Sequence, residues 1–243
     1  MRVAALMSGS GSNLQKILQN QAHGKAYRVV CILTDNPQSN AKAIAKRFGI
    51  PYEENDIAAF YRQKKRKRSD LTVRPEFDRI TIAKLTPYKP DAVAYCGYMS
   101  LASPVLVNAF LGVNVHPADL RIKDNQGHRR FVGAHAVRDA ILAGQKELRA
   151  TTHLVSEKAD QGAILMVSQH VRVRLPKGFN ANDATPVENV TREHQERLKE
   201  KGDWVIFPKT LQGIAEGRFA KDGKGRLYFD GKPVPDGVDA SKA

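Results

Sequence analysis

An asparagine and a histidine stand two residues apart in the stretch GVNVHPADL, residues 112–120, and each follows a valine. A run of valines and small residues predicts a strand, in which alternate side chains share a face, so Asn114 and His116 project to the same side. Pro117 ends the strand directly after them. Polar side chains at the C-terminal end of a strand stand where ligands bind in open α/β sheets. Because a strand histidine is usually structural, a chemical role depends on further polar partners.

Asp160 is the partner that the sequence offers. It lies in the polar link EKADQG, residues 157–162, between two predicted strands, and this link can fold back over the strand that carries His116. An Asn amide and an imidazolium stabilise an oxyanion, while a carboxylate raises the pKa of a nearby histidine and handles the proton. Without a Ser or Cys nucleophile, the trio predicts acyl transfer to an external nucleophile. Zinc is the alternative, but neither a CxxC nor an HExxH spacing supports it, and we expect no metal.

The turn SGSGSN, residues 8–13, joins a predicted strand to a predicted helix. Its backbone N–H groups face the positive end of the helix dipole, where a phosphate fits. Gly11 lets the backbone approach an anion closely, Ser12 adds a donor, and Asn13 adds another donor and caps the helix. The turn matches neither GxGxxG nor a Walker loop, so it does not indicate a nucleotide cofactor. An ordinary small-residue turn remains the alternative.

The composition is that of a basic globular protein. The chain has 243 residues, 42% of them hydrophobic, and 39 Lys and Arg against 25 Asp and Glu give a net charge of +14. This charge favours anionic partners such as phosphates, polycarboxylates or nucleic acid. Cys31 and Cys96 fall in apolar runs and are expected to be small buried residues rather than a disulfide. The N-terminal apolar run is shorter than a signal sequence, so we expect a cytoplasmic protein without membrane contact.

Strands and helices are expected to alternate along the first part of the chain. Strands are predicted at residues 2–7, 27–34, 50–54 and 91–97 and in the Asn–His stretch, with helices at 14–21, 40–49, 75–88, 103–110 and 134–144. Two strands, 149–156 and 163–173, a loop at 176–186, a mainly helical segment at 187–216 and a hairpin turning on Asp230-Gly231 follow. Alternation of this kind predicts a mainly parallel open sheet with flanking helices.

We therefore predict a single α/β domain over residues 1–243 with a Rossmann-type N-terminal half. Residues 1–117 form the phosphate-binding half, residues 118–218 the other half, and residues 219–243 a C-terminal hairpin and tail.

Four motifs carry a resemblance to a known family. MSGSGSNLQ, GYMSLASPVLV, NVHPADL and HLVSEKADQGAIL are similar, in order and spacing, to the folate-dependent formyltransferases, and EGRF with YFDGKPVP resembles the terminal hairpin of the glycinamide ribonucleotide transformylases. The resemblance implies formyl transfer from 10-formyltetrahydrofolate to a phosphorylated amine, most simply glycinamide ribonucleotide in purine synthesis. It covers nearly the whole chain.

The resemblance also implies roles for individual residues. Asn114 and His116 would polarise the formyl carbonyl, with His116 as proton donor and Asp160 tuning its pKa. Gly11, Ser12 and Asn13 would hold the ribose phosphate, and Arg74 would lie near the carboxylate end of the folate. The segments around the pterin would be Met99, Ser100, Leu101 and Ala102, and Ser156, Glu157, Lys158, Ala159 and Asp160. Glu200 and Asp203 would face the amine.

Several departures from the family leave the acceptor open. The family usually has an arginine where this chain has Ser100, and the segment at 118–133 is longer and more basic than usual. Another amine, a sugar amine or water could therefore be the acceptor. The run RQKKRKR, residues 62–68, is expected to be solvated surface or a weak steering patch. A non-catalytic RNA-binding protein is the alternative of another class, although few aromatic residues adjoin the run. A monomer and a homodimer both remain possible.

Overall fold

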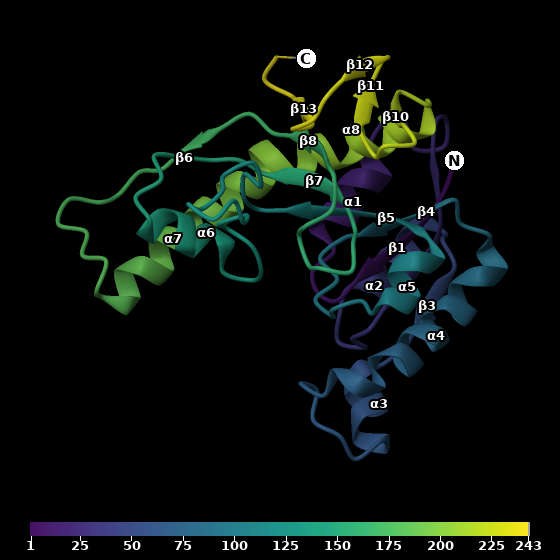
Figure 1. The fold of residues 1–243 in the computed structure, drawn as a ribbon. Coiled ribbons are helices and arrows are strands. Elements are labelled where there is room, and N and C mark those ends of the chain that lie inside the picture. Colours follow the sequence, from purple (N-terminus) through teal and green to yellow (C-terminus); the bar gives the residue numbers. More distant parts are fainter. Residues whose placement is uncertain (243) are drawn as a thin grey trace. The chain divides into compact units, whose positions relative to one another are not determined.

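The computed structural model describes residues 1–242, which form two compact units. Unit 1 consists of residues 1–114 and 155–158, and unit 2 consists of residues 115–154 and 159–242. Figure 1 shows the elements of both units. The prediction that the whole chain is a single domain remains a prediction.

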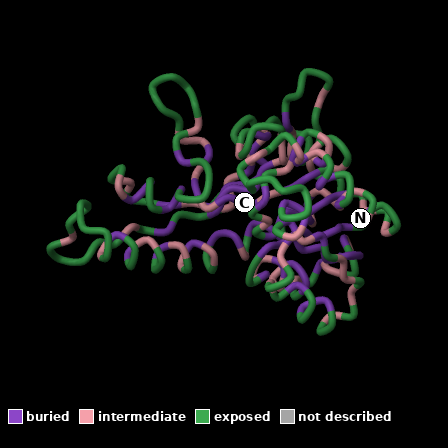
Figure 2. The backbone as a smooth tube through the Cα atoms, turned by 90° about the horizontal axis from the view of Figure 1, so that it is seen from below, coloured by how far each residue is buried: buried purple, intermediate pink, exposed green. Residues whose placement is uncertain are grey.

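Unit 1 contains a parallel sheet built from near-continuous apolar runs. Its strands are β1 (Arg2–Met7), β2 (Arg28–Thr34), β3 (Tyr52–Glu54), β4 (Ala92–Tyr95) and the start of β5 (Leu111–His116). They pair in the order β5-β4-β1-β2-β3, and every pairing is parallel. The residues of β1 after Arg2 and all of β4 are buried, as expected for strands covered on both faces. Figure 2 colours the backbone by the burial of each residue.

Helices connect the strands of unit 1. They are α1 (Ser12–Gln19), α2 (Ala41–Phe48), α3 (Ile57–Gln63), α4 (Arg74–Leu85) and α5 (Pro104–Ala109), with single turns η1 (Leu71–Val73) and η2 (Thr86–Tyr88). The helix α3 was not predicted. Its N-cap is Asp56, whose carboxylate accepts hydrogen bonds from two backbone N–H groups, and its apolar side chains pack on Phe77 of α4.

Unit 2 is built around an antiparallel pair. The strands β7 (Thr151–Leu154) and β8 (Ile164–Val167) pair antiparallel, and β13 (Val238–Asp239) pairs parallel to β8. The predicted strand at 163–173 is divided: β9 (Val171–Arg172) leaves β8 and pairs with β6 (Glu147–Leu148). The break follows from Ser168, whose hydroxyl accepts a hydrogen bond from the N–H of Ala150 at 2.9 Å and donates to the carbonyl of Gln169 at 2.7 Å.

The remaining helices of unit 2 are α6 (Ala136–Leu142), α7 (Ala184–Leu198), the π-turn η3 (Lys199–Asp203) and α8 (Trp204–Ala215). The strands β10 (Phe219–Lys221), β11 (Leu227–Phe229) and β12 (Lys232–Pro233) form the small C-terminal sheet. Asp230 and Gly231 have φ values of 49° and 75°, as a two-residue hairpin turn requires.

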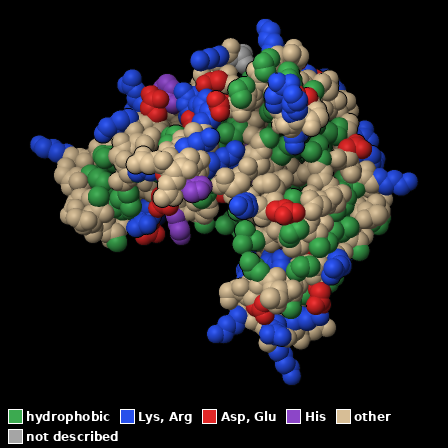
Figure 3. Space-filling view, in the orientation of Figure 1, with side chains coloured by type: hydrophobic (Ala, Val, Ile, Leu, Met, Phe, Trp, Pro, Cys, Tyr) green, Lys and Arg blue, Asp and Glu red, His purple; other side chains and the backbone are tan. Residues whose placement is uncertain are grey.

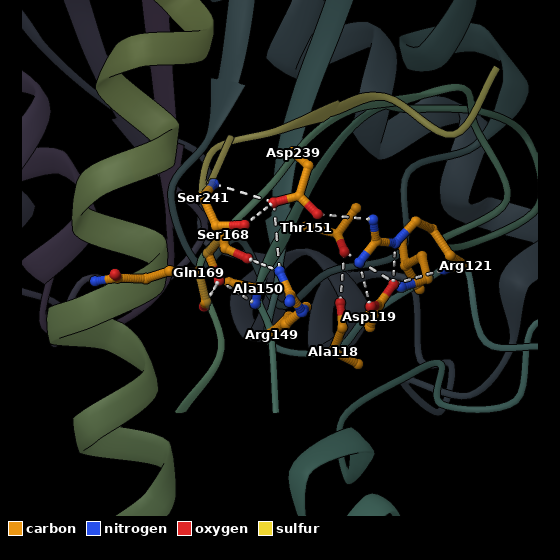
Figure 4. A network of polar contacts seen from close by, with 11 residues as sticks. Ala118, Asp119, Arg121, Arg149, Ala150, Thr151, Ser168, Gln169, Asp239 and Ser241 are labelled. Carbon is orange, nitrogen blue, oxygen red and sulfur yellow. Dashed lines mark hydrogen bonds and ion pairs between the residues drawn. The ribbon is translucent and has the colours of Figure 1, made fainter. Parts of the chain in front are cut away.

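Two arginines fix the C-terminal strand of unit 2 through Asp239. Arg121 Nη1 lies 3.3 Å from one oxygen of Asp239, and Arg149 Nη1 lies 3.5 Å from the other. Arg121 also pairs with Asp119 at 2.7 Å, and Arg149 donates to the carbonyl of Ser168 at 2.8 Å. Figure 4 shows the network. The network connects the C-terminal strand to the start of the long segment 118–133.

The fold class is confirmed: a mostly parallel open sheet with flanking helices and small antiparallel strands near the C-terminus. Cys31 and Cys96 are buried and free, as predicted. Over residues 1–242, no helix combines the length and the apolar character that crossing a membrane requires.

Candidate active site

Asn114 and His116 lie on β5 and are followed by Pro117. In unit 1, Asn114 is half-buried and lies opposite Tyr95 in the register of β5 with β4. In unit 2, His116 is buried, with 5% of its surface exposed. The two residues are separated by Val115 on β5, and the expectation that their side chains share one face of the strand stays a prediction.

Both ring nitrogens of His116 face oxygen acceptors of unit 2. Nδ1 lies 3.5 Å from Oδ2 of Asp160, and Nε2 lies 2.9 Å from the carbonyl oxygen of Phe131. The predicted contact with Asp160 is therefore present, and Asp160 raises the pKa of His116, as predicted, but the net shift is downward. Burial lowers the pKa of His116 below its usual value, and Asp160 and the Phe131 carbonyl raise it by less.

Asp160 is held by several donors at once. His153 Nε2 lies 3.5 Å from its Oδ1, and the N–H of Gly133 donates to its Oδ2 at 2.8 Å. Burial alone would raise the pKa of this carboxyl group, but His153, His116 and the Gly133 N–H together lower it to about 2. With this low pKa, the carboxylate of Asp160 is ionised at neutral pH. Asp160 also has a φ of 56°, in the left-handed region that few residues other than glycine adopt.

Arg129 fixes the backbone around Asp160. Its guanidinium donates to the carbonyl of Asp160 and, at 2.9 Å, to the carbonyl of Gly162. Gly162 leaves no room for a side chain, because a Cβ there would lie 1.7 Å from the carbonyl oxygen of Leu154. The last part of the segment 118–133, residues 129–133, thus contacts His116, Asp160 and the link that carries Asp160.

His153 and Arg129 are polar residues of the site that the sequence analysis missed. His153 stands in the apolar run of β7, and a histidine there beside the link containing Asp160 is a signal that could have identified it. Arg129 belongs to a segment rich in basic residues, and nothing in its spacing distinguishes it from its neighbours.

The glycine turn of unit 1 lies between β1 and α1. Gly11 is the N-cap of α1, with a φ of 69°, and a Cβ there would lie 2.5 Å from Ile44. The expectation that Asn13 caps the helix is wrong, because the helix begins at Ser12 and has no side-chain cap. Asn13 instead has a buried side-chain oxygen without a hydrogen-bond partner. The turn keeps the backbone donors of a first helical turn that suit an anion.

Met99 and Leu101 follow β4 and are 66% and 54% exposed. Between them, Ser100 is 6% exposed and donates a hydrogen bond to the buried carboxylate of Asp35. The neighbouring Ala102 is half-buried. This segment therefore presents two apolar side chains at the C-terminal edge of the parallel sheet, where ligands bind in such folds.

The other predicted folate-side residues differ in accessibility. Arg74 is only 4% exposed: its Nε donates to Tyr61 Oη at 3.3 Å, its guanidinium lies over the ring of Phe77, and its Nη1 has no hydrogen-bond partner. Ser156 donates to the carbonyl of Lys158 at 2.8 Å, and Glu157 accepts from Asn108 at 3.2 Å.

The two acidic residues predicted at the amine end lie on the π-turn η3 of unit 2. Glu200 is exposed, whereas Asp203 is buried, with 4% of its surface exposed. The structure therefore gives them different environments. Their roles toward an amine stay predictions. Within residues 1–242, no group of three or more His, Cys, Asp and Glu side chains is placed to hold a metal ion.

A parallel sheet with a glycine-rich first turn and a buried imidazole–carboxylate pair is typical of α/β group-transfer enzymes. Comparison with known proteins narrows this class. Residues 1–176 match the formyl transferase family. The chain therefore belongs to the formyl transferase family and is a formyltransferase enzyme, as predicted.

Two curated relatives and one solved structure illustrate the similarity. Phosphoribosylglycinamide formyltransferase of Haemophilus influenzae is 27% identical over 238 residues, covering 96% of each chain. The enzyme of the same name from Mycobacterium tuberculosis is 31% identical over 166 residues, covering 68% of each chain. The crystal structure of glycinamide ribonucleotide transformylase 1 from Symbiobacterium toebii is 28% identical, with a TM-score of 0.72, and covers 94% of this chain and 93% of that one.

Proposed function

We propose that the protein transfers the formyl group of 10-formyltetrahydrofolate to the amine of glycinamide ribonucleotide, a step of purine synthesis. The observation that carries the proposal is the buried pair of His116 and Asp160 at the end of β5, with Asn114 on the same strand. The names of the relatives support this acceptor. The proposal includes a cytoplasmic location for the protein.

Asn114, His116 and Asp160 have different roles in the proposed acyl transfer. The amide N–H₂ of Asn114 donates to the oxygen of the carbonyl under attack, where negative charge develops. His116 donates a proton from its ring, and the ionised Asp160 stabilises the doubly protonated ring beside it. Because Asp160 is held by Gly133 and His153 as well, it stays ionised and in position throughout.

The environment of His116 has a further consequence for the proposal. Its Nδ1 faces Asp160 and its Nε2 faces the carbonyl of Phe131, so proton donation from Nε2 to a substrate requires that carbonyl to be displaced. The segment 129–133 must therefore shift when substrates bind, or the proton must leave from the side of Asp160.

Two features of unit 1 fit the substrates. The folate supplies a formyl carbon bonded to a nitrogen that becomes the leaving group. Exposed Met99 and Leu101 suit the apolar ring of a folate. The Nη1 of Arg74 lacks a hydrogen-bond partner but is buried, so it can reach a polar atom of the folate only if the side chains that cover it move. Gly11, Ser12 and Asn13 provide the backbone and side-chain donors that suit a ribose phosphate.

A product assay tests the proposed function. Purified protein is incubated with 10-formyltetrahydrofolate and glycinamide ribonucleotide, and both tetrahydrofolate and the formylated amine are measured by mass spectrometry. Parallel reactions contain glycinamide without the ribose phosphate, a sugar amine, or no amine. We expect one formylated ribonucleotide for each tetrahydrofolate and little product in the other reactions.

Matched variants connect the assay to the site. His116→Asn should abolish transfer, whereas His170→Asn, which changes an exposed histidine of unit 2, should retain it. Tetrahydrofolate formation without an amine would favour a hydrolase. Formylation of a sugar amine in preference to the ribonucleotide would favour another acceptor, and no turnover of any kind would favour the non-catalytic RNA-binding alternative.

A further inference from the structure

The basic segment, defined as residues 64–68 (KKRKR), follows α3 in unit 1, and all five side chains are exposed. Lys64 pairs with Glu76, and Arg66 lies 3.5 Å from Asp70. Lys65 and Lys67 make no ion pair within the part of the chain that the structure describes. Figure 3 shows Lys and Arg side chains projecting at the end of unit 1 that carries α3. The segment therefore keeps positive charge that the protein itself does not neutralise.

Arg68 brings one of these charges to the segment after β4. Its Nη2 lies 3.5 Å from Oγ of Ser100, and Ser100 in turn donates to Asp35. Asp35 is 1% exposed, and its other oxygen has no hydrogen-bond partner. A guanidinium has five N–H donors, and this one long contact occupies at most one of them. Most of the hydrogen-bonding capacity of Arg68 therefore remains available to a ligand.

Exposed apolar side chains flank Ser100, the residue that this guanidinium contacts. Met99 and Leu101 stand on either side of Ser100 and are the two large exposed hydrophobic residues of this segment. The buried hydroxyl of Tyr98, in the same segment, also lacks a hydrogen-bond partner. A ligand that covers Met99 and Leu101 with a flat ring and continues past Ser100 would therefore carry its next groups toward Arg68 and the lysines.

We infer that Arg68, Lys65 and Lys67 bind the γ-linked glutamate tail of the folate co-substrate. The inference rests on the proposed function, and it assigns a ligand, the tail of the co-substrate, to the basic segment. Each glutamate added to a folate adds one carboxylate, and a guanidinium and flexible ammonium groups match a chain of carboxylates in charge and reach. Ion pairs at such exposed positions are individually weak, so discrimination should grow with the number of glutamates and fade with salt.

The test compares tetrahydrofolate carrying one glutamate with tetrahydrofolate carrying a pentaglutamate tail. Binding is measured by isothermal titration calorimetry, with the KM of the corresponding formyl donors as a second measurement. The variant Lys65→Asn/Lys67→Ser/Arg68→Gln removes the charges; asparagine is chosen because residue 65 has a φ of 52°. The control Lys221→Ser/Lys224→Ser/Lys232→Ser removes three exposed charges from the C-terminal hairpin.

We expect wild type and control to bind the pentaglutamyl folate on the order of tenfold more tightly than the monoglutamyl folate at low salt. The ratio should fall to about one in the basic-segment variant, with kcat unchanged. Folate binding and formyl transfer without any effect of tail length would overturn this inference and leave the proposed function standing. Tight binding of a single-stranded oligonucleotide at physiological salt, lost in the variant, would also overturn it. No folate binding by wild type would instead refute the proposed function.

Discussion

Replacing Asp160 with asparagine removes a charge from the site while keeping the shape of the side chain. In the wild-type protein the N–H of Gly133 donates to Asp160 at 2.8 Å, and the side-chain oxygen of an asparagine can still accept this hydrogen bond. What disappears is the negative charge 3.5 Å from His116 and 3.5 Å from His153. The protonated form of His116 then loses its only acidic neighbour among the described residues, while the burial that already lowers its pKa remains.

The size of the effect follows from this geometry. Two unit charges about 4 Å apart interact by about 4 kcal/mol at an effective dielectric constant of about 20, and by about 1 kcal/mol in water. Because His153 shares the carboxylate, we expect the lower half of this range. The pKa of His116 should therefore fall further. Since about 1.4 kcal/mol corresponds to a factor of ten in the protonated fraction, kcat at neutral pH should fall roughly tenfold or more.

The direct assay is a proton NMR titration of the ring of His116, with its resonance assigned by comparison with His116→Asn. Asp124→Asn is the matched control, because it removes a carboxylate 3.6 Å from His128, whose side chain is 74% exposed. The control should leave both the titration of His116 and kcat unchanged. An unchanged or increased pKa of His116 in Asp160→Asn would refute the electrostatic role assigned to Asp160.

Three further predictions concern the glycine turn, the Asp160 link and the C-terminal strand. Asn13→Ala should raise the KM of the phosphorylated amine about tenfold and leave the KM of the folate unchanged, as initial-rate kinetics can measure; an equal loss for both would mean that the turn is only structural. Gly162→Ala should destabilise the protein by about 1–3 kcal/mol in urea unfolding, because its Cβ would meet the carbonyl of Leu154, whereas Gly223→Ala, which meets nothing within 4 Å, should not. Asp239→Asn should cost about 1–2 kcal/mol at neutral pH. Burial raises the pKa of Asp239, but its hydrogen bonds and arginines lower it to about 2, so the difference from wild type should persist above about pH 4 and vanish as the pH falls toward 2.

The parallel part of the fold could be predicted because its signals are local. Buried parallel strands read as apolar runs, and glycine and proline mark their ends. The helix α3 was missed because its capping residue, Asp56, precedes only a short apolar turn and a run of charges. The division of the strand predicted at 163–173 depends on Ser168, and its bond to the N–H of Ala150 exists only after β7 and β8 have paired.

The candidate site could be predicted where strand alternation and a short link bring residues together, as for His116 and Asp160. The contacts of Arg129 could not be predicted, because they depend on how the segment 118–133 folds back. The contact of His153 with Asp160 was missed although His153 stands close to the link in the sequence. The contact between Arg68 and Ser100 joins residues 32 positions apart and leaves no pattern in the sequence. The net lowering of the pKa of His116 could not be predicted, because a sequence identifies the charged neighbour, which raises this pKa, but not the depth of burial, which lowers it more.

The backbone at Asp160 bears on the redesign of this protein. A φ of 56° is where a designer who considers only the main chain would place glycine, because other residues pay about 1 kcal/mol or more there. Asp160→Gly would relieve that strain and remove the carboxylate beside two histidines. Sequence optimisation guided by backbone geometry would therefore select against the residue that the chemistry requires, and a library built for thermal stability should hold position 160 fixed.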